Sequence, residues 1–529
     1  MQGGASSAPD VRGSGAAALG GPAAGTAART AAARPYAILL LAWIAAIKAT
    51  GASLSTTALV HATTDLGLGT LLRAACASAV SLTIAATAVA AGVAADRLGR
   101  RRVLMGSFVI AGAANLVVLA APSGWLYFGG HVAAGVGYGA MTTGSYAYVK
   151  AVTPGKGLGW GLGLYTVFTT FLCTATIVAG GTLAGASWRL LFLVVPAMCA
   201  VAAVLTPRLL PVMPRAGSGP VDLRGLVTLG AGMLLLISGL TTATSAPHDL
   251  VAWLPAVAGV ALLAAWVALE VRSRHPAFPV RLFRSRRYVA AAVFGLAANM
   301  AAAAMALGMS DHLQYVARES VLVASIGLQP SYIVGGLGGL AAGGLLAGRW
   351  LKDGVPARHV MAGGGLLQAT GYVLLVPLHH GSSYWAILPG TLLAGFGLAA
   401  AMTAQAQVIV RCAPAGDYGA VTSSKTSISQ LGSALGMILT VLFLDRFTAG
   451  GIVRGLRAEG VTPSDAHSTL TALDNFLTTG QKPGLHDLPD AIGHAMSSFS
   501  GAFHGSMLLC AAIMVAASAA AWVLMKEPA

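Results

Sequence analysis

The sequence predicts an all-α polytopic membrane protein, and three observations lead to this prediction. The 529 residues are 56% hydrophobic and only 9% charged, whereas soluble proteins carry about a quarter charged residues. Apolar stretches near the ~20 residues that cross a bilayer as a helix recur along the chain. The basic residues gather in alternate connections between these stretches. This composition excludes a soluble multidomain enzyme, a disordered protein and a nucleic-acid binder with a polar basic surface.

Residues 1–35 consist mainly of Gly, Ala, Ser and Pro and hold too few large apolar side chains to fold alone. We interpret them as a disordered cytoplasmic tail, because they lack the apolar core and cleavage site of a signal peptide. Fourteen transmembrane helices are predicted to follow, at residues 36–60, 72–95, 103–121, 125–149, 158–184, 188–209, 224–245, 250–270, 288–313, 322–347, 359–378, 383–408, 417–443 and 500–524. Between the last two of these helices, residues 446–498 are predicted to form an external loop with short helices.

The placement of positive charge tests this topology. With the N-terminus inside, 23 of the 32 Lys and Arg residues fall in inner segments and 7 in outer ones. Such an inner excess is the positive-inside pattern. We therefore expect a plasma-membrane protein with both termini in the cytoplasm, whose net charge of +15 requires no nucleic acid.

The connection between the second and third predicted helices carries a specific motif: Gly92-Val93-Ala94-Ala95-Asp96-Arg97-Leu98-Gly99-Arg100-Arg101-Arg102. Gly92 would let two helices approach closely, Asp96 can pair with a nearby guanidinium, and Gly99 permits a tight turn. The alternative is an ordinary basic inner loop, but charge bias alone does not place the Asp and both glycines. The motif resembles the cytoplasmic signature of the major facilitator superfamily.

A weaker echo of this motif, residues 344–353, follows the tenth predicted helix. The resemblance implies a major facilitator fold built from two six-helix halves. With fourteen helices, the chain is similar to the fourteen-spanner drug–proton antiporters, arranged as 6 + 2 + 6. The implied units are an N-terminal bundle at 36–210, an inserted pair with linkers at 211–287, and a C-terminal bundle at 288–529. In such transporters the signature belongs to a conformational gate, here Gly92, Asp96, Arg97, Gly99, Arg100 and Arg101.

The sequence departs from that family at three places. Gly51 stands where the first helix usually carries an Asp, and His131 takes the place of an Arg in the fourth helix. An imidazole can change charge near neutral pH, although a packed histidine that joins two helices is equally compatible with the sequence. In the fifth helix Gly180 and Gly181 keep the packing signature of antiporters, but Thr176 and Ile177 replace its Gly-Pro pair.

Lys48 is an ammonium placed deep in the first predicted helix. At ~1.5 Å per residue it lies roughly 18 Å into a ~30 Å apolar core, where a Lys costs ~3 kcal/mol. We interpret it as part of a substrate or proton pathway. The alternative is a structural lysine that is satisfied by Ser53 and Thr50.

Other polar groups within predicted helices are further candidates for this pathway. Lys425 lies in the thirteenth helix and Asp311 near the outer end of the ninth, although a snorkelling lysine and an interfacial carboxylate are the alternatives. Gln314 follows Asp311 at the helix end. The remaining polar candidates are Asn299, Gln405, Gln407, Tyr138 and Tyr146.

The functional prediction is a secondary active transporter that exports a small amphipathic or anionic compound in exchange for protons. Uptake of an organic anion is the first alternative, and a non-transporting sensor or lipid-handling protein is the second. No phosphate-binding loop or zinc motif is present, so we expect no enzyme activity, cofactor or metal. The five cysteines lie in or beside apolar stretches and predict neither disulfides nor a metal site. The expected partners are a small-molecule substrate, protons and the lipid bilayer, and we expect a monomer.

Overall fold

The computed structural model is all-helical over the residues that it describes. These are residues 35–68, 70–153, 157–184, 187–213, 223–245, 249–273, 278, 280–312, 335–336, 338–379, 382, 384–413, 421, 423–436, 440, 443, 447, 451, 454 and 491–525. Gln314, the predicted N-terminal tail up to Arg34 and most of the predicted external loop lie outside them.

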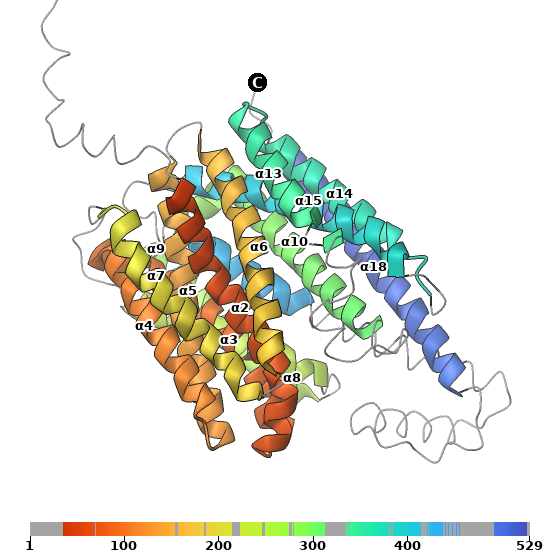
Figure 1. Cartoon of the computed structure of the whole chain (residues 1–529). Coiled ribbons are helices and arrows are strands. Elements are labelled where there is room, and N and C mark those ends of the chain that lie inside the picture. Colours follow the sequence, from red (N-terminus) through yellow and green to blue (C-terminus); the bar gives the residue numbers. More distant parts are fainter. Residues whose placement is uncertain are drawn as a thin grey trace, which may run out of the picture.

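Fourteen helical segments correspond to the fourteen predicted helices (Figure 1). They are α2 (Pro35–Asp65), α3 (Thr70–Leu98), α4 (Arg100–Leu119), α5 (Gly124–Val152), α6 (Leu158–Ala184), α7 (Val194–Leu209), α8 (Leu223–Ser245), α9 (Leu250–Arg272), α10 (Arg286–Asp311), α13 (Gly338–Lys352), α14 (Ala357–Leu374), α15 (Ile387–Cys412), residues 423–436 and α18 (Ala491–Leu524). Short 3-10 helices precede α7 (Trp188–Leu193), α10 (Val280–Arg284) and α15 (Tyr384–Ala386). Among the described helices, eight are long and apolar enough to cross a membrane.

Among the predicted helix boundaries that are wrong by more than one turn, two concern the end of α13 and the start of α18. The helix α13 continues to Lys352, through most of the segment that the sequence analysis assigned to a connection. Glycine-rich sequence lowered the apparent helical signal there, but close packing against α6 supports the helix. The last helix begins at Ala491 instead of residue 500, because its first turns are polar and carry no membrane-like hydropathy.

The buried apolar side chains form two large cores. One is built mainly by α2, α4, α5, α6 and α7, with Leu41, Phe108 and Tyr148 fully buried. The other is built mainly by α10, α14, α15 and α18, with Phe294 and Phe503 at its centre. We call α2–α7 the first half, and α10, α13, α14, α15, residues 423–436 and α18 the second half.

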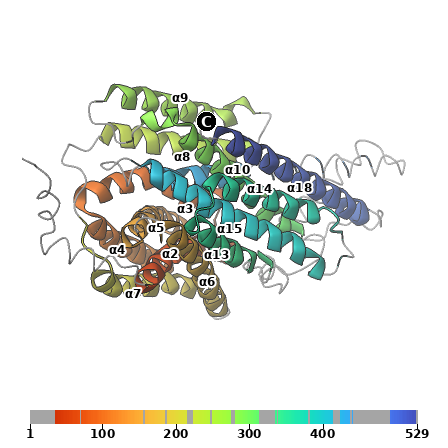
Figure 2. The same ribbon diagram turned by 90° about the horizontal axis from the view of Figure 1, so that it is seen from above.

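The helices α8 and α9 pack tightly on one another at the edge of the molecule (Figure 2). A Cβ on Gly259 would meet the backbone of Leu236, and one on Gly239 would meet that of Ala256. Their attachment to the first half is α8 against α3, where a Cβ on Gly230 would lie 3.0 Å from the Ala86 carbonyl oxygen. Small residues therefore bring these backbones together, as in many membrane helix pairs.

The two ends of the bundle differ in how they are tied. At one end, which we call the arginine end, α3 turns into α4 through Leu98–Arg102. At the opposite end Arg189 ties three helices together. Its guanidinium donates hydrogen bonds to the carbonyl oxygens of Leu119 (3.3 Å) and Ala121 (2.8 Å) and pairs with Asp65 at 2.9 Å.

Candidate functional site

The turn at the arginine end needs a glycine. Gly99 is the single residue between α3 and α4, and its φ of 102° lies in the region that residues with a Cβ rarely adopt. Its amide donates to the carbonyl oxygen of Ala95 at 3.2 Å, and its own carbonyl accepts from Arg102 at 3.1 Å. The motif therefore reverses the chain between two membrane helices with a single connecting residue.

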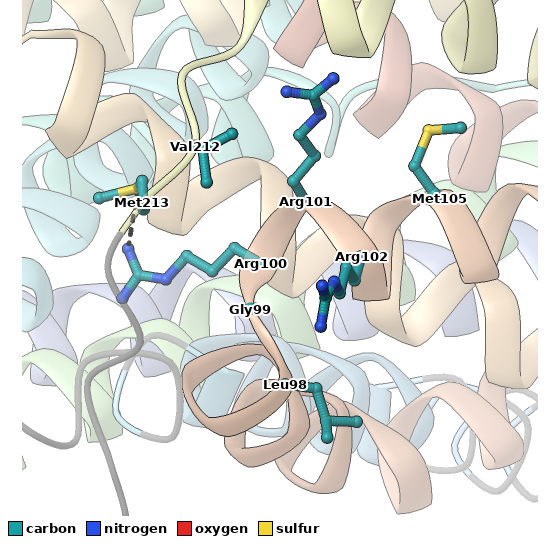
Figure 3. Close-up of a pocket in the computed structure, with 8 residues that line it drawn as sticks. All are labelled: Leu98, Gly99, Arg100, Arg101, Arg102, Met105, Val212 and Met213. Carbon is teal, nitrogen blue, oxygen red and sulfur yellow. Dashed lines mark hydrogen bonds between the residues drawn. The ribbon is translucent and has the colours of Figure 1, made fainter.

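Asp96 and Arg100 form an ion pair across this turn. Their atoms Oδ1 and Nη2 are 3.0 Å apart, and the side chains are only 5% and 9% exposed. The same guanidinium contacts the sulfur of Met213 at 3.7 Å (Figure 3), and together with Arg101 and Arg102 it borders a pocket of about 480 Å³. This pair lies within the first half, so a role for Asp96 in a gate between the halves stays a prediction.

A contact between α6 and α13 joins the two halves near the arginine end. Gly159 and Gly163 on α6 face Gly344 and Gly348 on α13. A Cβ on Gly163 would lie 2.5 Å from the Gly344 carbonyl oxygen, and one on Gly348 would lie 3.0 Å from the Cα of Gly163. Each helix thus presents two glycines four residues apart, which is the spacing that lets membrane helices touch backbone to backbone.

Two further contacts join the halves, one at the middle of α3 and one at the arginine end. The Ser427 hydroxyl donates to the Ala85 carbonyl oxygen at 3.2 Å, and the ammonium of Lys352 lies 6.0 Å from the ring centre of Trp160. Lys352 ends α13 and Trp160 lies in the first turn of α6, so both are at the arginine end. The described halves are therefore packed together at this end.

Lys48 lies on α2 between the two halves and is partly exposed. It lies close enough to the ammonium of Lys425 and the thiol of Cys173 for electrostatic interaction. Thr50, proposed as an alternative partner, bonds instead to the Thr176 hydroxyl of α6 at 2.5 Å. The hydroxyl of Thr50 thus bonds to a neighbouring helix and not to the Lys48 ammonium.

Lys425 reaches across from the second half to a pair of tyrosines. Its Nζ donates to the Tyr146 hydroxyl at 3.2 Å and lies 4.5 Å from the centre of that ring. Tyr146 packs against Tyr165 with a centroid distance of 4.8 Å, and the Tyr165 hydroxyl bonds to Ser145 at 2.9 Å. Two sequence candidates, Lys425 and Tyr146, are therefore in direct contact.

His131 lies apart from this cluster. Its ring packs edge-on against Tyr127 and Phe192, at centroid distances of 4.4 and 5.6 Å, and its Nδ1 is 3.3 Å from the Ser55 hydroxyl. The Nε2 atom is buried and has no hydrogen-bond partner among the residues that the structure describes. This environment matches the alternative of a packed histidine between helices more closely than a solvated proton site.

The other candidates are distributed along the helices. Asp311 is the last residue of α10, and Gly180 and Gly181 lie in the last turns of α6. Thr176, which replaces the family's Gly one turn earlier, donates to the Leu172 carbonyl oxygen at 2.8 Å. Ile177 replaces the Pro, and α6 continues through this position, where a Pro would bend it.

Several polar candidates join helices. Gln405 donates to the Ala291 carbonyl oxygen at 2.9 Å, and Asn299 donates to the Ser429 hydroxyl at 3.2 Å. Tyr138 accepts a hydrogen bond of 2.9 Å from Asn115. These contacts assign the three side chains to packing between neighbouring helices.

Tyr165 and the glycines of α6 were not among the site residues predicted from the sequence. An aromatic residue in an apolar helix is indistinguishable by pattern from a core residue, so nothing singled out Tyr165. The spacing of Gly159 and Gly163 was a usable signal. It was weakened by the abundance of glycine, which numbers 68 in this chain.

Several known proteins are similar to this chain in sequence or in fold. The Multidrug resistance protein B homolog of Mycobacterium tuberculosis is 27% identical over 406 residues, covering 74% of this chain and 73% of that protein. The multidrug efflux pump LfrA of Mycolicibacterium smegmatis is 26% identical over 463 residues, covering 84% and 87%. The crystal structure of the human organic anion transporter MFSD10 has a similar fold, with a TM-score of 0.58, 15% identity and coverage of 91% and 98%.

The family itself follows from a longer match. Residues 41–437 match the Major Facilitator Superfamily, and this range includes the Asp96 motif, the α6–α13 contact and both lysines. The all-helical fold of the described residues also resembles the solved MFS (major facilitator superfamily) proton:xylose symporter XylE, with a TM-score of 0.55, 13% identity and coverage of 91% and 95%. The chain therefore belongs to the major facilitator superfamily, and it is a multi-pass membrane transporter.

Proposed function

We propose that this transporter exports small amphipathic or anionic compounds, such as drugs or secondary metabolites, in exchange for protons. The observation that carries the proposal is the closed α6–α13 contact at one end of the interface between the halves. Transport by alternating access needs such a contact at one end at a time. The efflux names of the relatives support export, and ionisable Lys48 near Lys425 supports coupling to protons.

We propose that the arginine end is cytoplasmic, with the chain in the plasma membrane and both termini inside. The positive-inside distribution of Lys and Arg supports this orientation. The closed contact between α6 and α13 would then seal the cytoplasmic side. Ser464→Cys in a cysteine-free protein tests the orientation: an impermeant maleimide should label it on intact cells, and labelling only after lysis would reverse the topology.

We also propose the arrangement 6 + 2 + 6. The two apolar cores support two halves, namely 36–210 and 288–529, and the peripheral position of α8 and α9 supports an inserted pair within 211–287. A monomer remains our expectation, because the proposed pathway lies within one chain.

Uptake of an organic anion is a second candidate function. Two observations favour it, the two lysines near the interface and the loss of the Gly-Pro pair at Thr176 and Ile177. The direction of the driving proton gradient separates the two functions, since an antiporter and a symporter use it in opposite senses.

Purified protein in proteoliposomes tests the proposal, with ethidium as a cationic compound and 1-naphthoate as an anionic one. Antiport predicts that vesicles with an acidic interior accumulate a compound, whereas symport predicts accumulation when the exterior is acidic. Protein-free liposomes and vesicles without a pH gradient are the controls. Absence of gradient-driven flux for both compounds would contradict secondary transport and favour a sensor or lipid-handling protein.

A further inference from the structure

Two lysines approach the interface from opposite halves of the molecule. Lys48 extends from α2 in the first half, and Lys425 extends from the helical residues 423–436 in the second half. Lys425 contacts Tyr146 of the first half at 3.2 Å, and Lys48 lies within electrostatic reach of Lys425. The two ammonium groups therefore repel one another across the boundary between the halves.

Neither ammonium forms an ion pair within the described part of the chain. The two ion pairs found there join Arg100 to Asp96 and Arg189 to Asp65, at the two ends of the bundle. The other acidic side chains that the structure describes are Asp249, Glu270 and Asp353, and none of them pairs with either lysine. A lysine at membrane depth costs ~3 kcal/mol even singly, and it needs compensation by charge or water. Among the described residues, the two neighbouring lysines therefore form a positively charged site without a carboxylate partner.

The groups that face the lysines are neutral and suited to a ring-bearing molecule. The ring of Tyr146 is partly exposed and packs on the buried ring of Tyr165, with a centroid distance of 4.8 Å, and the Cys173 thiol lies within electrostatic reach of Lys48. The Tyr146 hydroxyl, which already accepts from Lys425, can donate its own proton to an oxygen of a ligand. Aromatic rings stack on such surfaces with a gain of about 0.5–1.5 kcal/mol beyond their burial.

The position of the cluster also fits a transported molecule. Tyr165 follows Gly163 on α6 by two residues, so the tyrosines lie at a similar depth to the α6–α13 contact, on the face of α6 that contacts α5. Lys48 lies roughly 20 Å along α2 from Pro35, at 1.5 Å per residue. Lys48 is thus set deeper than the closed contact, on its side away from the arginine end.

We propose that Lys48 and Lys425 together bind the anionic group of an organic acid, with the ring of Tyr146 packing against its aromatic body. This inference rests on the proposed transport function and narrows its substrate class to aromatic carboxylates and related anions. A bound carboxylate would neutralise the repulsion between the two halves and draw them together. Binding at this position therefore joins recognition of the anion to movement of the halves.

A matched series of ligands tests the inference on the purified full-length protein in nanodiscs. The series is 1-naphthoate, 2-naphthoate and salicylate, each with its neutral amide, and the measurement is the dissociation constant by calorimetry. We expect at least one carboxylate to bind ten-fold or more tightly than its amide. Lys48→Gln and Lys425→Gln should each remove that preference, while Lys48→Arg should retain it. Lys352→Gln, at the arginine end, is the matched control and should leave the preference unchanged.

The possible outcomes separate this inference from the proposed function. If no carboxylate binds better than its amide, or if both Gln variants keep the preference, the anion site is wrong. Gradient-driven flux of ethidium in the same preparation would then leave secondary transport standing. Selective binding of a carboxylate without any gradient-driven flux would support the anion site and contradict the transport proposal. Because the Gln variants could misfold, their thermal unfolding midpoints should match the wild type before binding is compared.

Discussion

The hydroxyl of Tyr138 occupies the space into which any side chain at Gly51 would project. A Cβ built on Gly51 would collide with the phenol oxygen and with the ring carbon that bears it. The hydroxyl is held in place by a hydrogen bond of 2.9 Å from Asn115. Any side chain at residue 51 would therefore require Tyr138 on α5 to move.

The first prediction concerns this contact. Gly51→Ala should lower the thermal stability of the purified protein by about 1–3 kcal/mol, because overpacking in a filled core forces side chains and backbone to shift. Gly106→Ala in α4 is the matched control and should be neutral, since a Cβ there has nothing within 4 Å. In a Tyr138→Leu background, Gly51→Ala should cost less. An equal cost in both backgrounds would show that Tyr138 is not the obstacle.

A second prediction concerns the glycine contact between the halves. Gly163→Val should hold α6 away from α13 and open the arginine end, since even a Cβ would lie 2.5 Å from the Gly344 carbonyl oxygen. Spin labels at Leu98 and Trp350, both exposed near that end, should move apart in electron paramagnetic resonance distance measurements. Gly363→Val, at an open position on α14, should leave the distance unchanged. An unaltered distance in Gly163→Val would contradict the role of this contact.

The third prediction addresses Asp96. Asp96→Asn removes one charge from a buried pair whose atoms are 3.0 Å apart, and leaves the Arg100 guanidinium with a weaker partner. We expect transport to fall ten-fold or more while expression and membrane insertion stay near those of the wild type. Asp353→Asn, an exposed position in the corresponding segment of the second half, should have little effect. Full flux in a well-expressed Asp96→Asn protein would exclude Asp96 from the gate.

The fourth prediction is a dependence of stability on pH. His312 follows α10, beyond the apolar span that ends at Met309. Burial, with smaller contributions from His504 and His379, lowers the pKa of His312 from 6.5 to about 4. Because the folded protein holds the neutral ring, this stabilisation is complete above pH 6.5 and is lost as the pH falls toward 4. The difference corresponds to about 3 kcal/mol.

Thermal unfolding between pH 7 and 4 measures this dependence. The wild-type midpoint should decrease as the pH falls, and His312→Gln should flatten the decrease because no ring remains to be protonated. His359→Gln, which removes another histidine packed against an aromatic ring, is the control and should keep the wild-type slope. An unchanged slope in His312→Gln would assign the acid sensitivity to other groups.

The order and type of the helices could be predicted because a membrane helix must be apolar over a set length. For the same reason α6 was predicted with the bounds Leu158–Ala184 that it has. The motif around Asp96 was specific enough to indicate both the turn and its ion pair. These features depend on local sequence, so one amino-acid sequence is sufficient to predict them.

The contacts between distant helices could not be predicted. Neither the spacing of Gly159 and Gly163 nor that of Gly344 and Gly348 states which helix lies opposite. Likewise, no pattern in the sequence indicates that Lys425 contacts Tyr146, 279 residues away. Pairing across the interface is decided by the fold, and the fold brings together residues that share no local pattern.

The α6–α13 contact has a consequence for the energy landscape of transport. At Gly159, Gly163, Gly344 and Gly348 there is no side chain to immobilise, so closing this contact costs no rotamer entropy there. Its stability comes from dispersion between backbones, which is lost gradually as the helices separate. The open and closed populations can therefore be close to balance. A full inversion from 1:99 to 99:1 requires about 5.5 kcal/mol of differential affinity, which is within reach of one small molecule bound beside the contact.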